Sequence, residues 1–582
     1  MNDVQAVLKG AIQDVFGLDM EPELSRPEEQ FGDFATNAAM QLTKKVGKPP
    51  REIAEALAAF VRESGSEHIK DVSIAGPGFI NITLTDESLA KLAGAAPTAK
   101  PQKYQGKTIV AEYSDPNPFK PLHAGHLYTT LVGDSIARLV EHAGAKTIRL
   151  NYGGDVGLHA GKSMWAIAKH LGGELPEKLQ DIPEDERAAW LGARYVEGNN
   201  AYEDDEAAKT EIVETNKRVY QLHEQNDHDS PFAHIYWTCR QWSYDYFAKL
   251  YEQLEVVPFD RFIPESEVTQ LGVDTVREQL EQGVYAKSDG AVVFKGEEHG
   301  LHTRVFISSE GLPTYEAKDV GLSLTKWRDY QFDESIIITA TEQAQYMQVV
   351  IASIKQFAPE PAERTTHLTH GVVKLQGGVK MSSRKGNVVT ALDILDAAHK
   401  AGAASEVEHS EESILAAVKY AFAKNRIGGD IVYDPEESVS LEGNSGPYLQ
   451  YAHARARSIL RKAAPEDRHP REGGDPVRVG SFSDWIPGQA GNDSILFDEA
   501  ERTLARKISE YPEATQKAVD ELMPHHICTY LYELAQTFNR FYEKSQVIGD
   551  PREATRLKLT ELYADTLKSG LNLLGITAPD RM

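Results

Sequence analysis

The stretch between residues 107 and 155 constrains the fold most, because it has the pattern of two strands joined by a helix. A short β-rich run, residues 108–111, is followed by a loop with three prolines and then by apolar residues at helical spacing from 128 to 140. A second β-rich run covers residues 147–152. Strand, helix and strand within about fifty residues form a βαβ unit, which requires a parallel sheet. The sequence therefore predicts a ligand site at the carboxyl ends of these strands.

The loop of this unit ends in His123-Ala124-Gly125-His126, directly before the predicted helix. Free N–H groups and the helix dipole favour anions at a helix N-terminus, and glycine lets the backbone approach a ligand. Two imidazoles add donors that can follow the charge growing on a phosphate during a displacement. We therefore expect polyphosphate chemistry here, with Glu112 and Asp155 at the same edge of the sheet. By spacing alone, a metal pair or a capping histidine stays open.

A second functional loop is predicted at residues 380–387, which read Lys-Met-Ser-Ser-Arg-Lys-Gly-Asn. Three cations and two hydroxyls lie within this run, and glycines 377, 378 and 386 flank it, so it suits a flexible polyphosphate clamp. A solvated basic turn is the commoner role of such a sequence. Its pairing with the two histidines, about 250 residues upstream, favours the clamp.

Size, charge and cysteine content bound the class of protein. With 582 residues the chain is too long for one ordinary core, and we expect about three or four domains. The formal charge of −26 means that a nucleic-acid partner needs local basic patches. Cys239 and Cys528 provide neither a disulfide framework nor a CxxC metal motif. We find no signal-peptide pattern and no apolar run of membrane-spanning length, so we expect a soluble, cytoplasmic protein without a membrane partner.

The predicted fold class is multidomain α/β, with three parts. Residues 1–98 form an α/β N-terminal module, with a linker over residues 92–106. Residues 107–400 form a Rossmann-like catalytic domain with a parallel sheet. An acidic helical insertion at about 165–290 separates the two halves of this sheet. The second half begins with short strands at 291–294 and 304–307. Residues 410–582 form an all-α bundle.

Two helices of the predicted bundle carry residues suited to RNA. Residues 448–462 form an amphipathic helix with four Arg or Lys side chains, and residues 530–542 carry five aromatic side chains. Aromatic rings interleaved with Arg can stack on and clamp single-stranded bases, although we expect any single ring to be core. Residues 465–493 are rich in Gly and Pro without a helical period, resemble peptides encoded by dispersed bacterial repeats, and are interpreted as an insert tolerated in a surface loop.

Taken together, these stretches resemble the bacterial type of arginyl-tRNA synthetase. This family belongs to the class I aminoacyl-tRNA synthetases. The resemblance runs over nearly the whole chain, apart from the insert at 465–493. Five stretches carry it, namely Phe-Gly-Asp-Phe-Ala-Thr-Asn at 31–37, Ser-x-Pro-Asn-x-x-Lys-x-x-His-x-Gly-His at 114–126, Asn-Tyr-x-Gly-Asp at 151–155, the loop at 380–387 and the C-terminal residues 573–582.

The resemblance implies a ligase that activates L-arginine with ATP and transfers it to the terminal ribose of tRNA(Arg), releasing pyrophosphate and AMP. Neither step needs an enzyme nucleophile, so catalysis is mainly positioning and charge stabilisation. The partners implied are tRNA(Arg), L-arginine and ATP, with Mg²⁺ inferred from ATP chemistry and no dedicated metal site. Several members of the family activate the amino acid only when tRNA is bound, and we expect the same here. We also expect a monomer.

The resemblance also implies roles at the ATP site. His123 and His126 contact the phosphates, and Lys380 neutralises the transition state. The family pattern implies further ATP contacts by Gly125, Met381, Ser382 and Ser383. Ser383 stands where the usual class loop has its second lysine, and Lys120, just upstream of the histidines, is expected to compensate as a catalytic residue.

For arginine and tRNA the resemblance implies two further sets of residues. A guanidinium offers five donors in a planar fork and is best held by carboxylates from two directions. Glu112 and Asp319 are expected to supply them, with Tyr315 and Gln343 completing the pocket and Asn117 holding the backbone end of the amino acid. Phe79 and Asn81 are expected to meet the tRNA elbow, and Tyr542 the anticodon loop.

Three alternatives are weighed against this interpretation. A class I synthetase for glutamine or glutamate is the nearest, but an acidic pair in the pocket repels glutamate. A small nucleotidyltransferase also uses His-x-Gly-His, but it is short and needs no helical C-terminal domain. A catalytically inactive tRNA-binding relative has no need of His123, His126 and Lys380 together.

Overall fold

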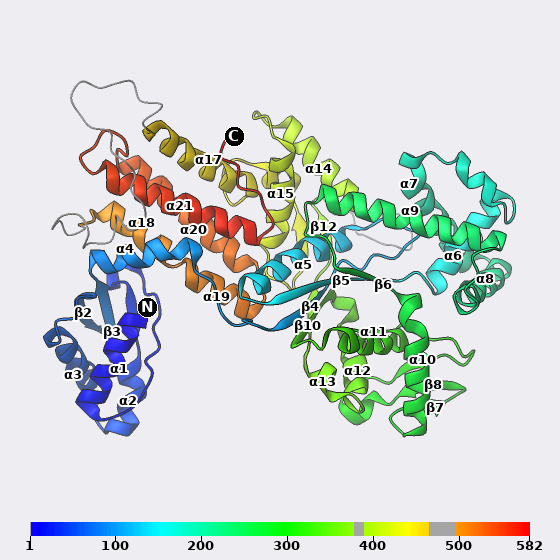
Figure 1. Ribbon diagram of the computed structural model, residues 1–582, viewed down its shortest axis with the longest axis horizontal. Coiled ribbons are helices and arrows are strands. Elements are labelled where there is room, and N and C mark those ends of the chain that lie inside the picture. Colours follow the sequence, from blue (N-terminus) through cyan, green and yellow to red (C-terminus); the bar gives the residue numbers. More distant parts are fainter. Residues whose placement is uncertain (1, 377–388, 465–495) are drawn as a thin grey trace.

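The computed structural model describes residues 2–376, 389–464 and 496–582. A compact N-terminal module, a central α/β part and a set of C-terminal helices follow one another along the chain (Figure 1). The predicted loop at 380–387 and the whole of the predicted insert at 465–493 lie outside the described residues, so the structure neither supports nor contradicts those two predictions.

The N-terminal module packs three helices on a small antiparallel sheet with strand order β1-β3-β2. Its elements are α1 (Asn2–Phe16), β1 (Phe34–Thr36), α2 (Ala38–Val46), α3 (Pro50–Glu63), β2 (Ile69–Ala75) and β3 (Phe79–Leu84). In α3, the apolar residues from Ile53 to Val61 that are separated alternately by one and three positions are buried, so one face of the helix meets the sheet. A further helix, α4 (Asp86–Ala95), covers the first residues of the predicted linker at 92–106 and so shortens it.

The central sheet has five parallel strands in the order β11-β10-β4-β5-β6, which confirms the predicted parallel sheet. The strands are β4 (Thr108–Glu112), β5 (Lys146–Gly153), β6 (Arg261–Pro264), β10 (Glu334–Ala340) and β11 (Thr365–His370), and α5 (Ala124–His142) connects β4 to β5. From β4 the chain builds β5 and β6 on one side and later β10 and β11 on the other. The strand order therefore reverses at β4, and ligands in such sheets bind at this switch point.

Two short runs predicted to begin the second half of the sheet lie elsewhere. Residues 291–294 and 304–307 are in a separate antiparallel sheet, formed by β7 (Ala286–Ser288), β8 (Ala291–Phe294) and β9 (Arg304–Ile307). The prediction was wrong because a short apolar run shows that a strand is buried without showing its partner. Conversely, β6 lies inside the range predicted as an insertion.

Helices fill the connections of the sheet. Between β5 and β6 lie α6 (Leu158–Leu171), α7 (Arg187–Asp204), α8 (Glu206–Glu224) and α9 (Pro231–Gln253), which form the helical lobe on the right of Figure 1. The second half of the sheet is covered by α10 (Glu265–Glu281), α11 (Tyr315–Tyr330), α12 (Ala344–Lys355) and α13 (Pro359–Glu363). Glycines let α10 and α11 touch, since a Cβ at position 272 would lie 2.0 Å from the Ala317 carbonyl oxygen.

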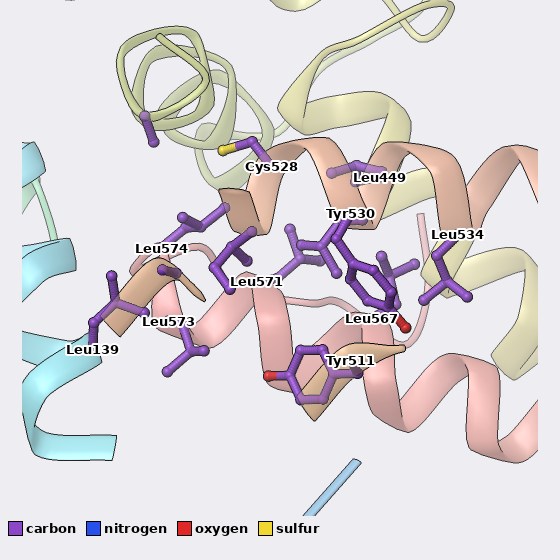
Figure 2. Close-up of a cluster of buried hydrophobic side chains, with 14 of the residues drawn as sticks. Leu139, Leu449, Tyr511, Cys528, Tyr530, Leu534, Leu567, Leu571, Leu573 and Leu574 are labelled. Atoms are coloured by element: carbon purple, nitrogen blue, oxygen red, sulfur yellow. The ribbon is translucent and has the colours of Figure 1, made fainter. Parts of the chain in front are cut away.

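The C-terminal part is helical, as predicted, apart from one short strand. It contains α14 (Ala391–Ala404), α15 (Glu411–Ala423), α16 (Pro435–Val439), α17 (Gly446–Ala463), α18 (Glu499–Ser509), α19 (Tyr511–Glu521), α20 (His525–Lys544) and α21 (Glu553–Leu573). The strand β13 (Ile431–Tyr433) pairs in parallel with β12 (Val373–Leu375). Figure 2 shows that side chains of α17, α19, α20 and α21 share one core with Leu139 of α5, so the bundle packs directly on the helix that begins at the two histidines.

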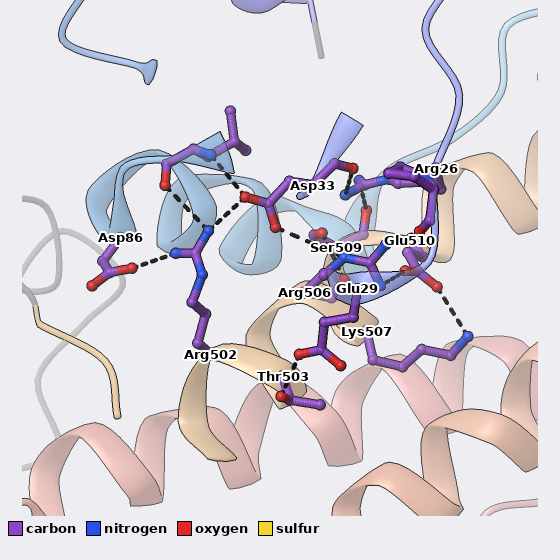
Figure 3. A network of polar contacts seen from close by, with 12 residues as sticks. Arg26, Glu29, Asp33, Asp86, Arg502, Thr503, Arg506, Lys507, Ser509 and Glu510 are labelled. Carbon is purple, nitrogen blue, oxygen red and sulfur yellow. Dashed lines mark hydrogen bonds and ion pairs between the residues drawn. The ribbon is translucent and has the colours of Figure 1, made fainter. Parts of the chain in front are cut away.

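Ion pairs join the N-terminal module to α18 (Figure 3). Arg502 reaches Asp33, at 2.5 Å, and Asp86, while both carboxylates are buried. Beside it, Arg26 donates to Glu513 at 2.9 Å and to the Ser509 carbonyl oxygen at 3.1 Å. Asp33 also accepts the Leu84 N–H at 2.7 Å, so a residue of the predicted 31–37 motif serves the contact between two parts of the chain.

Candidate active site

A cleft of about 570 Å³ opens at the carboxyl edge of the parallel sheet. Every strand of the sheet contributes to its wall: Glu112 ends β4, Gly154 follows β5, Glu265 follows β6, Gln343 lies in the short 3₁₀ turn after β10, and His370 ends β11. The cleft brings together all the described residues that were predicted for catalysis, ATP and arginine, namely Glu112, Asn117, Lys120, His123, Gly125, His126, Tyr315, Asp319 and Gln343.

The two histidines form a reciprocal cap at the start of α5. His123 Nδ1 accepts from the N–H groups of Gly125 at 3.1 Å and His126 at 3.3 Å, and His126 Nδ1 accepts the His123 N–H at 3.3 Å. A nitrogen that accepts carries no proton, so the proton of each neutral ring is on Nε2. The rings stack with centroids 3.7 Å apart. The two histidines therefore do cap the helix, which is one of the alternatives left open by the sequence. Each ring still has one Nε2–H donor.

Burial keeps both rings neutral. Burial and the nearby Lys120 ammonium lower the pKa of His123 to about 4, and burial and His123 lower the pKa of His126 well below its ordinary value. Gly125 is required by the cap, since a Cβ there would lie 2.9 Å from His123 Cε1. Next to the cap, the Ala124 N–H donates to the Val389 carbonyl oxygen at 2.9 Å. The chain that follows the predicted loop at 380–387 is thereby tied to the histidine motif.

Glu112 is paired inside the protein. Its Oε2 lies 2.6 Å from Lys326 Nζ, and the two side chains are 4% and 1% exposed. Lys326 also donates to Ser335 Oγ at 3.2 Å. One of the two predicted guanidinium-binding carboxylates thus has a cation partner already, and Lys326 on α11 was missed by sequence reasoning.

Asp319 is the other predicted carboxylate, and it has no hydrogen bond or ion pair with any described residue. It is 7% exposed and lies one turn after Tyr315 on α11, which is the shared helix face that the spacing predicts. Burial, followed by Glu112 and Glu265, raises the pKa of Asp319 well above its ordinary value. A cation entering the cleft would relieve this unfavourable environment.

Two further contacts shape the wall near β5 and β6. Glu265 forms a buried ion pair with Lys318, the residue before Asp319. Asn117 Oδ1 accepts the Gly154 N–H at 3.0 Å, and a Cβ at position 154 would lie 2.4 Å from that oxygen, so glycine is required there. Asn117 therefore holds the loop after β5, which leaves its amide donors for a ligand.

Asp155 follows β5 at the carboxyl edge of the sheet, as the sequence predicts, but it does not line the cleft. It is fully buried, accepts from Ser266 N–H at 2.9 Å and Ser266 Oγ at 2.7 Å, and pairs with Arg240 at 3.0 Å. Tyr236 donates to its carbonyl oxygen at 3.0 Å. The residue joins α9 and the start of α10 to the end of β5, so its contacts are those of a structural anchor.

The residues predicted to meet tRNA lie apart from the cleft. Phe79 begins β3 with 42% of its surface exposed, whereas Asn81, in the middle of the same strand, is 6% exposed. Tyr542 is half-buried near the end of α20, and the Arg455 guanidinium of α17 lies over its ring at 4.5 Å. Of the aromatic side chains in α20, Tyr530, Phe538 and Phe541 are buried core residues.

Comparison with known proteins agrees with this architecture. A model of the class I tRNA synthetase (R) catalytic domain matches residues 91–434, a DALR anticodon binding domain model matches 449–582, and a model of the arginyl tRNA synthetase N terminal domain matches 2–84. The fold and the cleft are thus those of a class I aminoacyl-tRNA synthetase.

Relatives and solved structures narrow the class. The chain is 32% identical to an arginine–tRNA ligase of Cutibacterium acnes over the full length of both chains, and 30% identical to one of Porphyromonas gingivalis over 98% of each. The Thermus thermophilus arginyl-tRNA synthetase superposes with a TM-score of 0.76 at 25% identity over all of both chains. This chain belongs to the arginyl-tRNA synthetase family.

Two features are absent from the described residues. No helix among them has the length and apolar character needed to cross a membrane. No group of three or more His, Cys, Asp and Glu side chains in the same part of the chain is arranged to hold a metal ion.

Proposed function

We propose that the chain performs the arginine–tRNA ligase reaction of its family in the cleft at the switch point, with ATP on the N-terminus of α5 and arginine over Asp319. The observation that carries this proposal is that one cleft holds two Nε2–H donors at a helix N-terminus and a buried carboxylate without a hydrogen-bond or ion-pair partner among the described residues. Phosphate and a cationic side chain are the chemical groups that these two ends favour.

Arginine is held by groups from four segments, namely β4, the loop after β4, α11 and the turn after β10. The guanidinium lies between Asp319 and Glu112, and Tyr315 and Gln343 close the sides of the pocket. Lys326 pairs with Glu112 and aligns it, so the substrate meets two carboxylates of which one already has a cation partner. The amide donors of Asn117 suit the backbone end of the amino acid.

The first chemical step is an attack by the arginine carboxylate on the α-phosphorus of ATP. A new oxygen–phosphorus bond forms, the bond to the bridging oxygen breaks, and pyrophosphate leaves. His123 and His126 donate from Nε2 to phosphate oxygens, Lys120 adds positive charge, and Lys380 adds more from the loop at 380–387. Mg²⁺ arrives with the ATP phosphates, and we assign no protein ligand to it.

The second step transfers the arginyl group to tRNA(Arg). The 2′-hydroxyl of the terminal ribose attacks the activated carbonyl, and AMP leaves with the bridging oxygen. Phe79 and Asn81 contact the tRNA elbow, Tyr542 contacts the anticodon loop, and the protein works as a cytoplasmic monomer. In support of the tRNA contacts, Phe79 is exposed and Tyr542 lies beside Arg455.

Arginine-dependent exchange of pyrophosphate into ATP, with and without tRNA(Arg), tests the proposal. We expect exchange with arginine in the presence of tRNA and none with glutamine or glutamate. Exchange with another amino acid would contradict the arginine pocket, and silence with every amino acid would indicate a relative that only binds tRNA.

Asp319→Asn tests the pocket more directly, because it removes a charge while keeping the shape. Loss of a buried charged contact is worth about 2 kcal/mol or more, so the KM for arginine should rise at least about 30-fold. The matched control is Glu281→Gln, because Glu281 is an exposed carboxylate at the end of α10. This variant should leave the KM for arginine unchanged. An unchanged KM in Asp319→Asn would place the guanidinium elsewhere.

A further inference from the structure

The backbone on either side of Lys120 is anchored to the helical lobe. Phe119 is fully buried, its ring centroid lies 5.4 Å from that of Tyr236 on α9, and its N–H donates to Ser243 Oγ at 2.8 Å. On the other side, Pro121 lies against Gly192 of α7, where a Cβ would come within 3.0 Å of Pro121 Cδ. The residue between them is therefore held from both sides.

This segment is also held in a conformation that it would not choose alone. Phe119 has φ of +69°, in the left-handed region that bulky side chains rarely adopt. Such a conformation persists only where the surroundings determine it, and it is concentrated at functional sites. Here the buried ring and the bond to Ser243 maintain it, so the direction in which Lys120 leaves the chain depends on the lobe.

The Lys120 ammonium lies over the ring of Tyr195 on α7, with Nζ 5.0 Å from the ring centroid. It has no hydrogen bond or ion pair with any described residue. Two nearby lysines do have carboxylate partners: Lys318 is paired with Glu265, and Lys326 is paired with Glu112. An aromatic face attracts a cation without donating or accepting a proton, so it holds Lys120 in place while the full positive charge stays available to a phosphate.

We infer that Tyr195 is a positioning residue for the activation step: its ring seats the Lys120 ammonium at the cleft, and the helical lobe thereby completes the active site. The inference rests on the proposed function, in which Lys120 contacts ATP. Tyr195 itself touches no reacting atom. The ring of Tyr195 is needed to hold the Lys120 ammonium, whereas the Tyr195 hydroxyl is not.

Four variants test the seat: Tyr195→Phe, which keeps the ring, Tyr195→Leu, which removes it, Lys120→Met, and the double variant Tyr195→Leu/Lys120→Met. The measurement is arginine-dependent ATP–pyrophosphate exchange with tRNA(Arg). A cation over a ring is worth enough to change kcat about 3- to 30-fold, so Tyr195→Leu should lose this much. The KM for arginine should stay within about twofold, and Tyr195→Phe should retain most of the activity.

The double variant decides between a seat and a merely structural contact. If the ring acts through Lys120, Tyr195→Leu causes no further loss once Lys120 is methionine. An equal loss in both backgrounds, or a loss in Tyr195→Phe as large as in Tyr195→Leu, would overturn the inference. If Lys120→Met matches the unmodified protein, the seat has no role although the ligase function stands. If the unmodified protein shows no exchange with arginine, the proposed function itself fails.

Discussion

At the scale of single residues, the cap at the start of α5 gives His123 two separable tasks. Its Nδ1 accepts from helix N–H groups, while its Nε2–H is the donor that we propose for phosphate. An N-cap contributes about 1 kcal/mol to stability, whereas a donor at developing charge affects rate much more strongly.

Replacing His123 by serine or alanine separates the two tasks. Serine can cap the helix and alanine cannot, so His123→Ala should have a free energy of unfolding about 1 kcal/mol below that of His123→Ser. Both lack the Nε2–H donor, and both should lower kcat of exchange by about 10²- to 10³-fold. Denaturant unfolding and exchange assays measure the two effects. Equal stabilities would contradict the cap, and near-full activity of the serine variant would contradict the donor role.

The charge on Lys120 predicts a pH dependence. Burial lowers the pKa of Lys120 to about 8, against an opposing influence of Glu265. The ammonium is therefore present below pH 8 and is lost as the pH rises through that value, so kcat of exchange should fall above about pH 8. Lys120→Arg keeps its charge at higher pH, and its own profile should stay flat to about pH 9 or beyond. Identical profiles in the two proteins would assign the decline to another group.

The site was predictable to the extent that its residues lie in short motifs. His123, Gly125 and His126 are recognisable because neighbouring residues serve one helix end, and they lie where the sequence predicts. Lys326 was not recognisable from the sequence. Its partner Glu112 is 214 positions away, and a lysine in a helical pattern gives no sign of being buried. Tyr195 is hidden in the same way, inside a helix whose pattern indicates only packing.

At the scale of elements, the sequence predicted where strands form better than it predicted which strands pair with one another. The strand–helix–strand unit at 108–152 is present in the parallel sheet, as predicted. The runs at 291–294 and 304–307 are strands too, but their partners were predicted wrongly. Pairing depends on tertiary contacts that a run of four residues does not encode.

Arg502 links two elements from distant parts of the chain, so its removal should loosen their contact. Arg502→Ala leaves Asp86 buried without its cation and leaves Asp33 with Arg506 alone, at 3.8 Å. The expected cost is about 3 kcal/mol, at the lower end for a broken buried pair because Arg502 is partly exposed. Calorimetry should show an earlier transition for the N-terminal module. Arg51→Ala breaks an exposed pair with Glu55 and should change little. Equal behaviour of both variants would show that α18 does not stabilise the module.

At the scale of the whole molecule, the predicted tRNA contacts and the cleft lie on different parts of the chain. The N-terminal module and the C-terminal helices are on the left of Figure 1, and the helical lobe extends to the right of the sheet. With a formal charge of −26, binding of an RNA requires local basic features, and Arg455 beside Tyr542 is one at a predicted contact.

Phe79→Ala and Tyr542→Ala should each weaken tRNA binding without disturbing arginine. Loss of one stacked ring is worth about 1–3 kcal/mol, so the KM for tRNA(Arg) should rise about 5- to 150-fold in aminoacylation, while the KM for arginine stays unchanged. Phe262→Ala is the matched control, since Phe262 is also 42% exposed but lies on β6. An increase in Phe262→Ala as large as in the other two would show that the effect is not specific to these surfaces.

The shared use of His123 as cap and donor also has an evolutionary consequence. A lineage that no longer needed aminoacylation would lose the selection on Nε2–H but keep the selection on a folded α5. Drift at position 123 would then favour Ser, Thr, Asp or Asn, which cap a helix, over Ala or Leu, which do not. A relative with one of these residues at position 123, and an intact core around α5, would be expected to have kept the fold after losing the chemistry.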